Sequence, residues 1–219
     1  MSHYKLIIFD CDGVLVDSER ITNQVFVDML NELGLPLTLE DMFEQFVGHS
    51  MSQCLDKITS MLGGPPPAEF LPAYRARTKN ALESDLLPVP GIEDALDKIA
   101  LPICVASSGD HEKMRTTLGI TGLWQRFEGR IFSVTEVANP KPAPDIFLHA
   151  AKKLNASPAD CVVVEDTPTG VASAVAAGMT VLGYCGLTPA HRLRAAGAHQ
   201  VFDSMAALPG LVQKPWGSA

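Results

Sequence analysis

The 219-residue sequence lacks paired cysteines, long apolar runs and basic runs. Its five cysteines are odd in number and include no CxxC pair, which argues against a disulfide scaffold. No apolar segment approaches the roughly 20 residues of a membrane span, and no signal-peptide pattern precedes the first predicted strand. The net charge is −8 without a basic run, so nucleic acid and anionic membranes are poor partners. We therefore expect a cytoplasmic protein.

The first apolar run, 6–9, leads directly into two carboxylates, Asp10 and Asp12, followed by Gly13. A continuous apolar run of this length suits a strand that is buried on both faces of a parallel sheet. Ligands of open α/β sheets bind at the carboxyl ends of strands. Two carboxylates there can hold a divalent cation or act as nucleophile and acid/base. The alternative is an ordinary Asp-Gly turn.

The segment 17–86 has helical periodicity and no strand-like run. The apolar residues that recur at helical spacing in its first part are Ile21, Val25, Met29 and Leu33. Thr38 with Asp41 resembles a capping box, and further helices are predicted at 52–62 and 68–84. We expect a small helical bundle inserted after the first strand.

Strands and helices alternate after the insert. The later predicted strands are 102–106, 130–133, 161–164, 179–183 and 200–202. Such alternation favours a parallel sheet covered on both faces, with Cys104 and Cys161 as buried thiols. The predicted fold class is α/β: a doubly wound parallel sheet formed by 1–16 and 87–219, with a helical domain at 17–86.

Two later strands also end in polar groups. Ser107 and Ser108 precede a helix that Asp110 can cap, and hydroxyls beside backbone N–H groups there can form an anion site. The alternative is that the serines only cap this helix. Glu165 and Asp166 can add carboxylate ligands for a cation, or can simply favour the start of the next helix.

Lys141 stands between Pro140 and Pro142, which stiffen the backbone and favour an extended form. A lysine held in this way can supply a fixed positive charge, whereas a lone lysine is usually a solvated surface group. The chain thus offers a carboxylate pair, an anion site, a lysine and a second carboxylate pair, all near predicted strand ends. Together they indicate a site for a phosphate and a divalent cation.

With these residues the chain resembles the haloacid dehalogenase superfamily of phosphohydrolases. The matching motifs are Asp10-Cys11-Asp12-Gly13-Val14, Ser107, Lys141 in Asn139-Pro140-Lys141-Pro142, and Glu165-Asp166 with Gly170. The helical insert resembles the small cap of one branch of this superfamily. The resemblance implies a phosphatase that hydrolyses small phosphorylated metabolites, with sugar phosphates first, through an aspartyl-phosphate.

The resemblance also implies residue roles. Asp10 would be the nucleophile and Asp12 the acid/base. The implied cofactor is Mg²⁺, with these ligands: Asp10, the carbonyl of Asp12, Asp166 and, as a further ligand or a support, Glu165. The groups implied to neutralise the phosphoryl oxygens are Ser107, Ser108 and Lys141.

Two alternatives remain. The related beta-phosphoglucomutases carry a cap histidine where this chain has Thr22, and a cap arginine where it has Met51, so a mutase is less favoured. A phospho-acceptor signalling module also combines an acidic pocket, a lysine and a hydroxyl. It would keep its phosphate rather than release many equivalents, and it lacks the DxDG pattern and the helical insert.

Substrate selection is assigned to the cap. The candidate selectors are His49 and Ser50 in a loop, and Arg75 and Lys79, which share a helix face at i, i+4. The alternative for the two basic residues is a solvated helix face. No pattern in the sequence indicates the oligomeric state.

Overall fold

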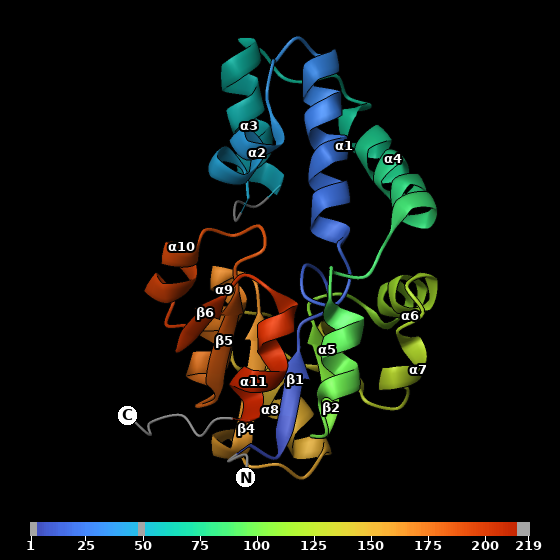
Figure 1. The fold of residues 1–219 in the computed structure, drawn as a ribbon. Helices are drawn as coiled ribbons and strands as arrows, with labels where there is room; N and C mark the ends of the chain where they lie inside the picture. The colour runs from blue at the N-terminus through green and yellow to red at the C-terminus, as the bar shows by residue number, and fades with distance from the viewer. Residues whose placement is uncertain (1–3, 48–50, 214–219) are drawn as a thin grey trace. The chain divides into compact units, whose positions relative to one another are not determined.

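The computed structural model describes residues 4–47 and 51–213 (Figure 1). These residues form two compact units. One comprises the described residues up to Asp17 and from Leu87 onward, and the other is Ser18–Leu86. No helix in the described part of the chain has both the length and the apolar character to cross a membrane.

The first unit is built on a parallel sheet with the strand order β3-β2-β1-β4-β5-β6 (Figure 1). The strands are β1 (Leu6–Phe9), β2 (Ile103–Ser107), β3 (Ile131–Ser133), β4 (Cys161–Glu165), β5 (Thr180–Tyr184) and β6 (Gln200–Phe202). The chain steps from β1 through β2 to β3, then returns to the other side of β1 for β4, β5 and β6. The strand order therefore reverses at β1, which is where doubly wound sheets bind ligands. The predicted fold class is confirmed.

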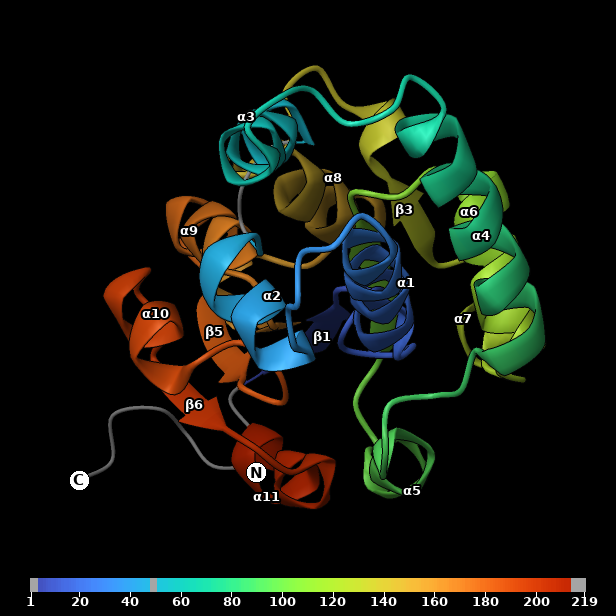
Figure 2. The same cartoon turned by 90° about the horizontal axis from the view of Figure 1, so that it is seen from above.

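Helices cover both faces of this sheet. They are α5 (Ile92–Lys98), α6 (His111–Ile120), α7 (Trp124–Phe127), α8 (Asp145–Lys153), α9 (Pro168–Ala176), α10 (Ala190–Ala195) and α11 (Leu208–Gln213). Figure 2 shows α8, α9 and α10 on one side of β1, and α5, α6, α7 and α11 on the other. Both faces must be covered because the strands are apolar on both. The short helices α7, α10 and α11 were not predicted from the sequence.

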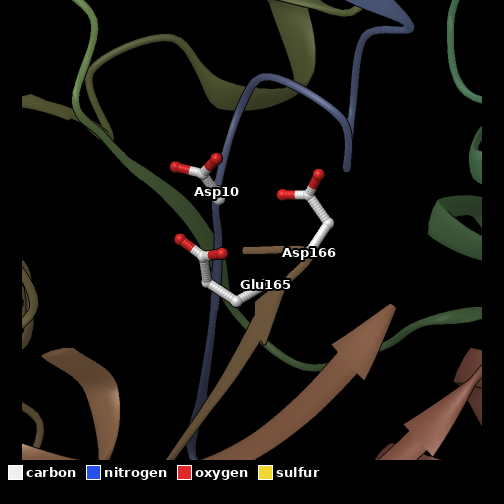
Figure 3. Close-up of side chains that lie close together, drawn as sticks. All are labelled: Asp10, Glu165 and Asp166. Atoms are coloured by element: carbon white, nitrogen blue, oxygen red, sulfur yellow. The ribbon is translucent and has the colours of Figure 1, made fainter. Parts of the chain in front are cut away.

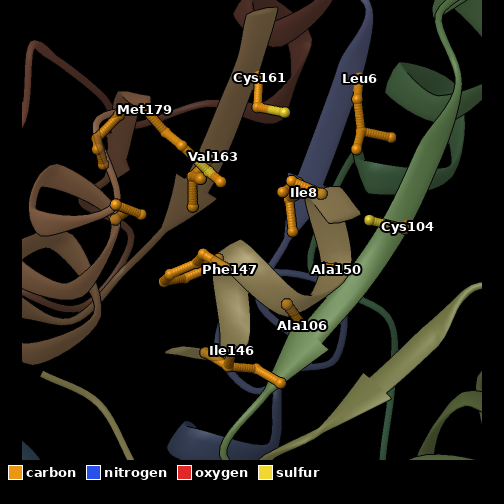
Figure 4. Close-up of a cluster of buried hydrophobic side chains, with 14 of the residues drawn as sticks. Leu6, Ile8, Cys104, Ala106, Ile146, Phe147, Ala150, Cys161, Val163 and Met179 are labelled. Carbon is orange, nitrogen blue, oxygen red and sulfur yellow. The ribbon is translucent and has the colours of Figure 1, made fainter. Parts of the chain in front are cut away.

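Alternate residues of each strand point to opposite faces. Leu6 and Ile8 of β1 belong to the cluster packed under α8, α9 and α10 (Figure 4). Phe9 faces the other side, where its ring meets that of Phe127 in α7 with 6.1 Å between centroids. Cys104 and Cys161 lie in the first cluster as buried free thiols, as predicted.

The second unit consists, in its described residues, of α1 (Ser18–Glu32), α2 (Leu39–Gln45), α3 (Met51–Leu62) and α4 (Phe70–Asp85). The predicted capping box is confirmed at the start of α2, between Thr38 and Asp41. The centre of the bundle is Phe26 of α1, whose ring makes edge contacts with three others. These are Phe46 at 5.9 Å, Phe70 at 5.7 Å and Tyr74 at 5.0 Å between centroids.

The helix predicted from the spacing of Ile21, Val25, Met29 and Leu33 is present as α1, but this row is not its fully buried face. Of the four residues only Met29 is buried. The helix also buries Phe26, Val27 and Leu30, whereas Ile21 and Val25 are only half-buried. The physical reason is that a strict four-residue spacing advances about 40° per step around a helix of 3.6 residues per turn. The row therefore crosses the buried face at Met29, while Val25 and Leu33 pack partly buried at the edge of the bundle core. The buried positions alternate steps of three and four.

The assignment of the buried face of α1 can be tested with the same Val→Ala substitution at two positions. We expect Val27→Ala to lower the free energy of unfolding by about 2 kcal/mol, because it removes two buried methyl groups and leaves a cavity. Val25→Ala should cost less than half as much, because Val25 is only half-buried. Denaturant unfolding of the two variants measures both values, and equal losses would contradict the assignment of the face.

Candidate active site

The strand register brings the predicted motifs to one edge of the sheet. Phe9, the last residue of β1, pairs with Val105 of β2 and Val164 of β4. The next residue, Asp10, donates its backbone N–H to the Val164 carbonyl at 3.0 Å. Asp10 therefore stands at the same level as Glu165, at the point where the strand order reverses.

Three buried carboxylates gather at this edge (Figure 3). Asp10, Glu165 and Asp166 each offer one oxygen, and these oxygens all lie within 4.8 Å of one another. Gly13 packs against this cluster with a φ of +75°, and a Cβ there would stand 2.1 Å from Asp166 Oδ2. The glycine of the first motif is thus required by its backbone conformation and by the neighbouring carboxylate.

Lys141 connects two of the three carboxylates. Its Nζ donates to Asp10 Oδ1 at 2.7 Å and to Glu165 Oε1 at 2.8 Å. The side chain is only 6% exposed. Burial by itself would lower the pKa of Lys141, but the charges of Asp10 and Glu165 and their hydrogen bonds outweigh burial and raise it. The lysine is a fixed, buried cation rather than the solvated surface group of the alternative interpretation.

The backbone around Lys141 differs from the prediction of an extended segment. The chain turns at 140–143, where the Ala143 N–H donates to the Pro140 carbonyl at 3.0 Å, and the Lys141-Pro142 peptide is cis. Ser173 of α9 donates its hydroxyl to the Ala143 carbonyl at 2.6 Å. The lysine is therefore aimed by a turn that α9 anchors, because the prolines limit φ without enforcing an extended chain.

Burial also dominates the electrostatics of Asp10. Desolvation raises the pKa of its carboxyl to about 7, against the opposing charge of Lys141 and with the support of the negative charges of Glu165 and Asp12. A carboxyl in this state exchanges its proton near neutral pH. A bound cation would favour the ionised form.

Ser107 and Ser108 follow β2 as predicted, and they do not cap the next helix. Ser107 is buried and its Oγ accepts the Gly109 N–H at 3.0 Å, whereas Ser108 is exposed. The cap of α6 is Asp110, whose side chain accepts the Lys113 N–H at 2.7 Å. The serines thus lie beside a helix N-terminus that another residue caps.

Glu165 is held by hydrogen bonds at both of its oxygens. Oε1 accepts from Lys141, and Oε2 accepts from the backbone N–H and the hydroxyl of Thr167 at 2.8 and 2.9 Å. Thr167 is also the cap of α9, because its Oγ1 accepts the Gly170 N–H at 3.0 Å. Glu165 is therefore not the cap of that helix.

Lys113 is a charged residue at this edge that was not predicted from the sequence. Lys113 of α6 donates from Nζ to Asp12 Oδ2 at 2.6 Å, across 101 residues of sequence. No local motif singles out this lysine. Its position on the first turn of the helix after Ser107 is the one signal that could have suggested it.

Of the candidate selectors in the helical unit, the structure describes Arg75 and Lys79. His49 and Ser50 lie outside the described residues. Arg75 and Lys79 are exposed on α4, and Lys79 Nζ lies 3.9 Å from a carboxylate oxygen of Glu83. A pocket of about 180 Å³ within this unit is lined by other residues: Glu19, Asn23, Phe26, Met42, Phe46, Val47, Met51, Cys54 and Tyr74.

Comparisons with known proteins show the family of the chain. A family model described as haloacid dehalogenase-like hydrolase matches residues 7–184. The 6-phosphogluconate phosphatase of Escherichia coli (strain K12) is 35% identical over 187 residues, which are 84% of each chain. The chain belongs to the haloacid dehalogenase-like hydrolases. Within that family it is a phosphoric monoester hydrolase.

Solved structures show the same fold. A conserved haloacid dehalogenase-like protein of Agrobacterium tumefaciens str. C58 is 38% identical, with a TM-score of 0.90, and the match covers 95% of this chain and 97% of that one. A HAD family hydrolase of Deinococcus radiodurans R1, solved with bound phosphate and sodium, is 30% identical. Its TM-score is 0.86, with 98% of this chain and 100% of that chain covered.

The contact between Gly170 and Glu165 yields a prediction. A Cβ at Gly170 would stand 1.6 Å from Glu165 Oε1, so Gly170→Ala must displace the carboxylate that holds Lys141. We expect kcat/KM for p-nitrophenyl phosphate to fall by about 10- to 100-fold, because displacements near 1 Å cost about that much.

The matched control is Gly119→Ala in α6, where a Cβ would meet no atom within 4 Å. This variant should keep full activity, and its free energy of unfolding should rise by about 0.5–1 kcal/mol, because alanine favours the helix. Equal activity in the two variants would contradict the role given to the Gly170 contact.

Proposed function

We propose that this enzyme hydrolyses small phosphorylated metabolites through an aspartyl-phosphate on Asp10. The observation that carries the proposal is the buried Asp10 carboxylate, fixed by Lys141 at the strand end where the sheet order reverses. Its position, its burial and its charged partner are those of an activated nucleophile.

Two steps complete the reaction. A carboxylate oxygen of Asp10 attacks phosphorus, the bond from phosphorus to the ester oxygen breaks, and Asp12 gives its proton to the departing oxygen. A water molecule then attacks the phosphorus of the aspartyl-phosphate, and Asp12 takes the proton from that water. Inorganic phosphate leaves and the Asp10 carboxylate is restored. One carboxyl thus serves as acid and then as base.

The charge on the transferring group needs fixed donors, because phosphoryl transfer relies on positioning and electrostatic stabilisation. We assign this role to Lys141, the Ser107 hydroxyl and the Ser108 N–H. The assignment is supported by the buried side chain of Lys141, by the burial of Ser107 and by the Gly109 N–H that orients Ser107 Oγ. The phosphate bound to the relative from Deinococcus radiodurans is consistent with an anion site in this fold.

The same edge suits Mg²⁺. Buried carboxylate oxygens within 4.8 Å of one another match the oxygen ligands and short bonds that Mg²⁺ requires. We propose Asp10, Asp166 and the carbonyl of Asp12 as ligands. Glu165 instead supports Lys141, because hydrogen bonds engage both of its oxygens. Bound Mg²⁺ would supply positive charge that offsets the negative charge of the carboxylates and the phosphate.

Substrate choice is assigned to the helical unit, residues 18–86, as a cap. The named activity of the relative from Escherichia coli makes 6-phosphogluconate the first substrate to test. Thr22 does not replace the mutase histidine, because its hydroxyl donates to the Glu19 carbonyl of its own helix at 3.2 Å. This supports hydrolysis over phosphate transfer between positions of a sugar.

The nucleophile is tested by phosphate release from a panel: 6-phosphogluconate, sugar 6-phosphates, beta-glucose 1-phosphate and phosphoglycolate. We expect wild-type protein to release many equivalents with Mg²⁺ and none with EDTA, and Asp10→Asn to remain at background, because an amide does not attack phosphorus. A single equivalent retained by the protein would instead identify a phospho-acceptor module. Turnover by Asp10→Asn would contradict the assigned nucleophile.

The raised pKa of Asp10 predicts that Mg²⁺ binding depends on pH. With a pKa of about 7, the Asp10 carboxyl is about one-tenth ionised at about pH 6 and nine-tenths at about pH 8. Because protons compete with the cation for this carboxylate, the association constant for Mg²⁺ should be about tenfold higher at the upper pH. Calorimetric titration measures it. Asp10→Asn should bind Mg²⁺ more weakly and lose this dependence, so an unchanged dependence would assign it to another group.

A further inference from the structure

We infer that Lys113 is a positioning residue that orients the acid/base Asp12, an inference that rests on the proposed function. Neither the motifs of the first strand nor those of the later strands include Lys113. The ion pair between its Nζ and Asp12 Oδ2, at 2.6 Å, is the observation that carries the inference.

Asp12 needs such an orienting contact. Its backbone is fixed in the tight turn after β1, where the Gly13 N–H donates to the Val16 carbonyl at 2.9 Å. Its side chain is not fixed by burial in the way that Asp10 is, because 18% of it is exposed, compared with 10% for Asp10. Partial exposure lets a carboxyl rotate, and an acid catalyst must present its proton to one oxygen of the substrate.

Lys113 is well placed to supply this orientation. Its backbone N–H is held by the cap residue Asp110, so the lysine belongs to the ordered first turn of α6. Its stem passes over Gly109, where a Cβ would stand 3.4 Å from Lys113 Cδ. The stem is thus guided by the loop that also carries Ser107, and the ammonium group reaches the turn that follows β1.

The ion pair also distinguishes the two oxygens of Asp12. Because the ammonium engages Oδ2, the proton that passes to the ester oxygen is carried by Oδ1. The two lysines then have separate partners: Lys141 fixes the nucleophile and Lys113 fixes the carboxyl that moves the proton. Loss of Lys113 should therefore impair proton transfer while the attack by Asp10 remains intact.

Leaving-group chemistry separates these two effects. An alkyl phosphate expels a strongly basic alkoxide and needs the proton from Asp12, whereas p-nitrophenyl phosphate expels a stabilised phenolate and needs it far less. We expect Lys113→Met to lower kcat/KM by about 10- to 100-fold on the best alkyl phosphate of the panel above, and to stay within about threefold on p-nitrophenyl phosphate.

The experiment compares wild type, Lys113→Met, Asp12→Asn and the double variant on both substrates, with thermal melting as a check on folding. Lys153→Met, which removes an exposed lysine of α8, is the matched control and should match wild type. If Lys113 acts through Asp12, the double variant is no slower than Asp12→Asn alone.

Four results would overturn the inference. Additive losses, or equal losses on both substrates, would mean that Lys113 acts on the phosphoryl group or on folding rather than through Asp12. If Asp12→Asn shows the leaving-group dependence while Lys113→Met behaves as wild type, the inference fails and the proposed function stands. If Asp12→Asn itself lacks that dependence, the acid/base role of Asp12 fails, and the inference fails with it.

Discussion

The site depends on one buried cation placed between two carboxylates. From its turn, Lys141 reaches Asp10, which follows β1, and Glu165, which ends β4. Its charge opposes the desolvation that raises the pKa of the Asp10 carboxyl. Much of the surrounding structure maintains this arrangement. Thr167 fixes the second oxygen of Glu165, and Gly170 leaves room for its side chain. Because the buried charge of Lys141 must be paired with Asp10 and Glu165, the fold has to bring together residues that are far apart in the sequence.

The two lysines of the site differ in their surroundings as well as in their partners. Lys141 is almost completely buried and bridges two acids, so its position is set by the core. Lys113 is 45% exposed and contacts one acid from a helix surface. A rigidly held lysine suits Asp10, the proposed nucleophile, because the distance and angle at which its oxygen approaches phosphorus must be exact. A more accessible lysine suits Asp12, for which we propose the role of acid and then base in two successive steps.

Most of the site residues that could be predicted from the sequence are recognisable from their place directly after an apolar, strand-like run. Asp10, Ser107 and Glu165 each end or directly follow an apolar run, and parallel pairing brings such positions to one edge. What the sequence did not reveal depends on distant contacts. The Lys113–Asp12 pair spans 101 residues, and the turn at Lys141 is anchored by Ser173. Which residues α1 buries also depends on its partners on other helices of the bundle, and the spacing within α1 does not reveal them.

The segments of the core that lead into and out of the helical unit are joined to each other by backbone hydrogen bonds. The Asp17 N–H donates to the Leu87 carbonyl at 3.0 Å, and the Val89 N–H donates to the Leu15 carbonyl at 3.0 Å. These hydrogen bonds hold the two ends of the insertion together within the core, whatever sequence lies between them. Doubling the length of an inserted loop adds only about 0.6 kcal/mol to the free energy of loop closure. In evolution, this junction lets the inserted segment be exchanged or enlarged while the carboxylates keep their places. One chemical centre can then serve many different phosphate esters.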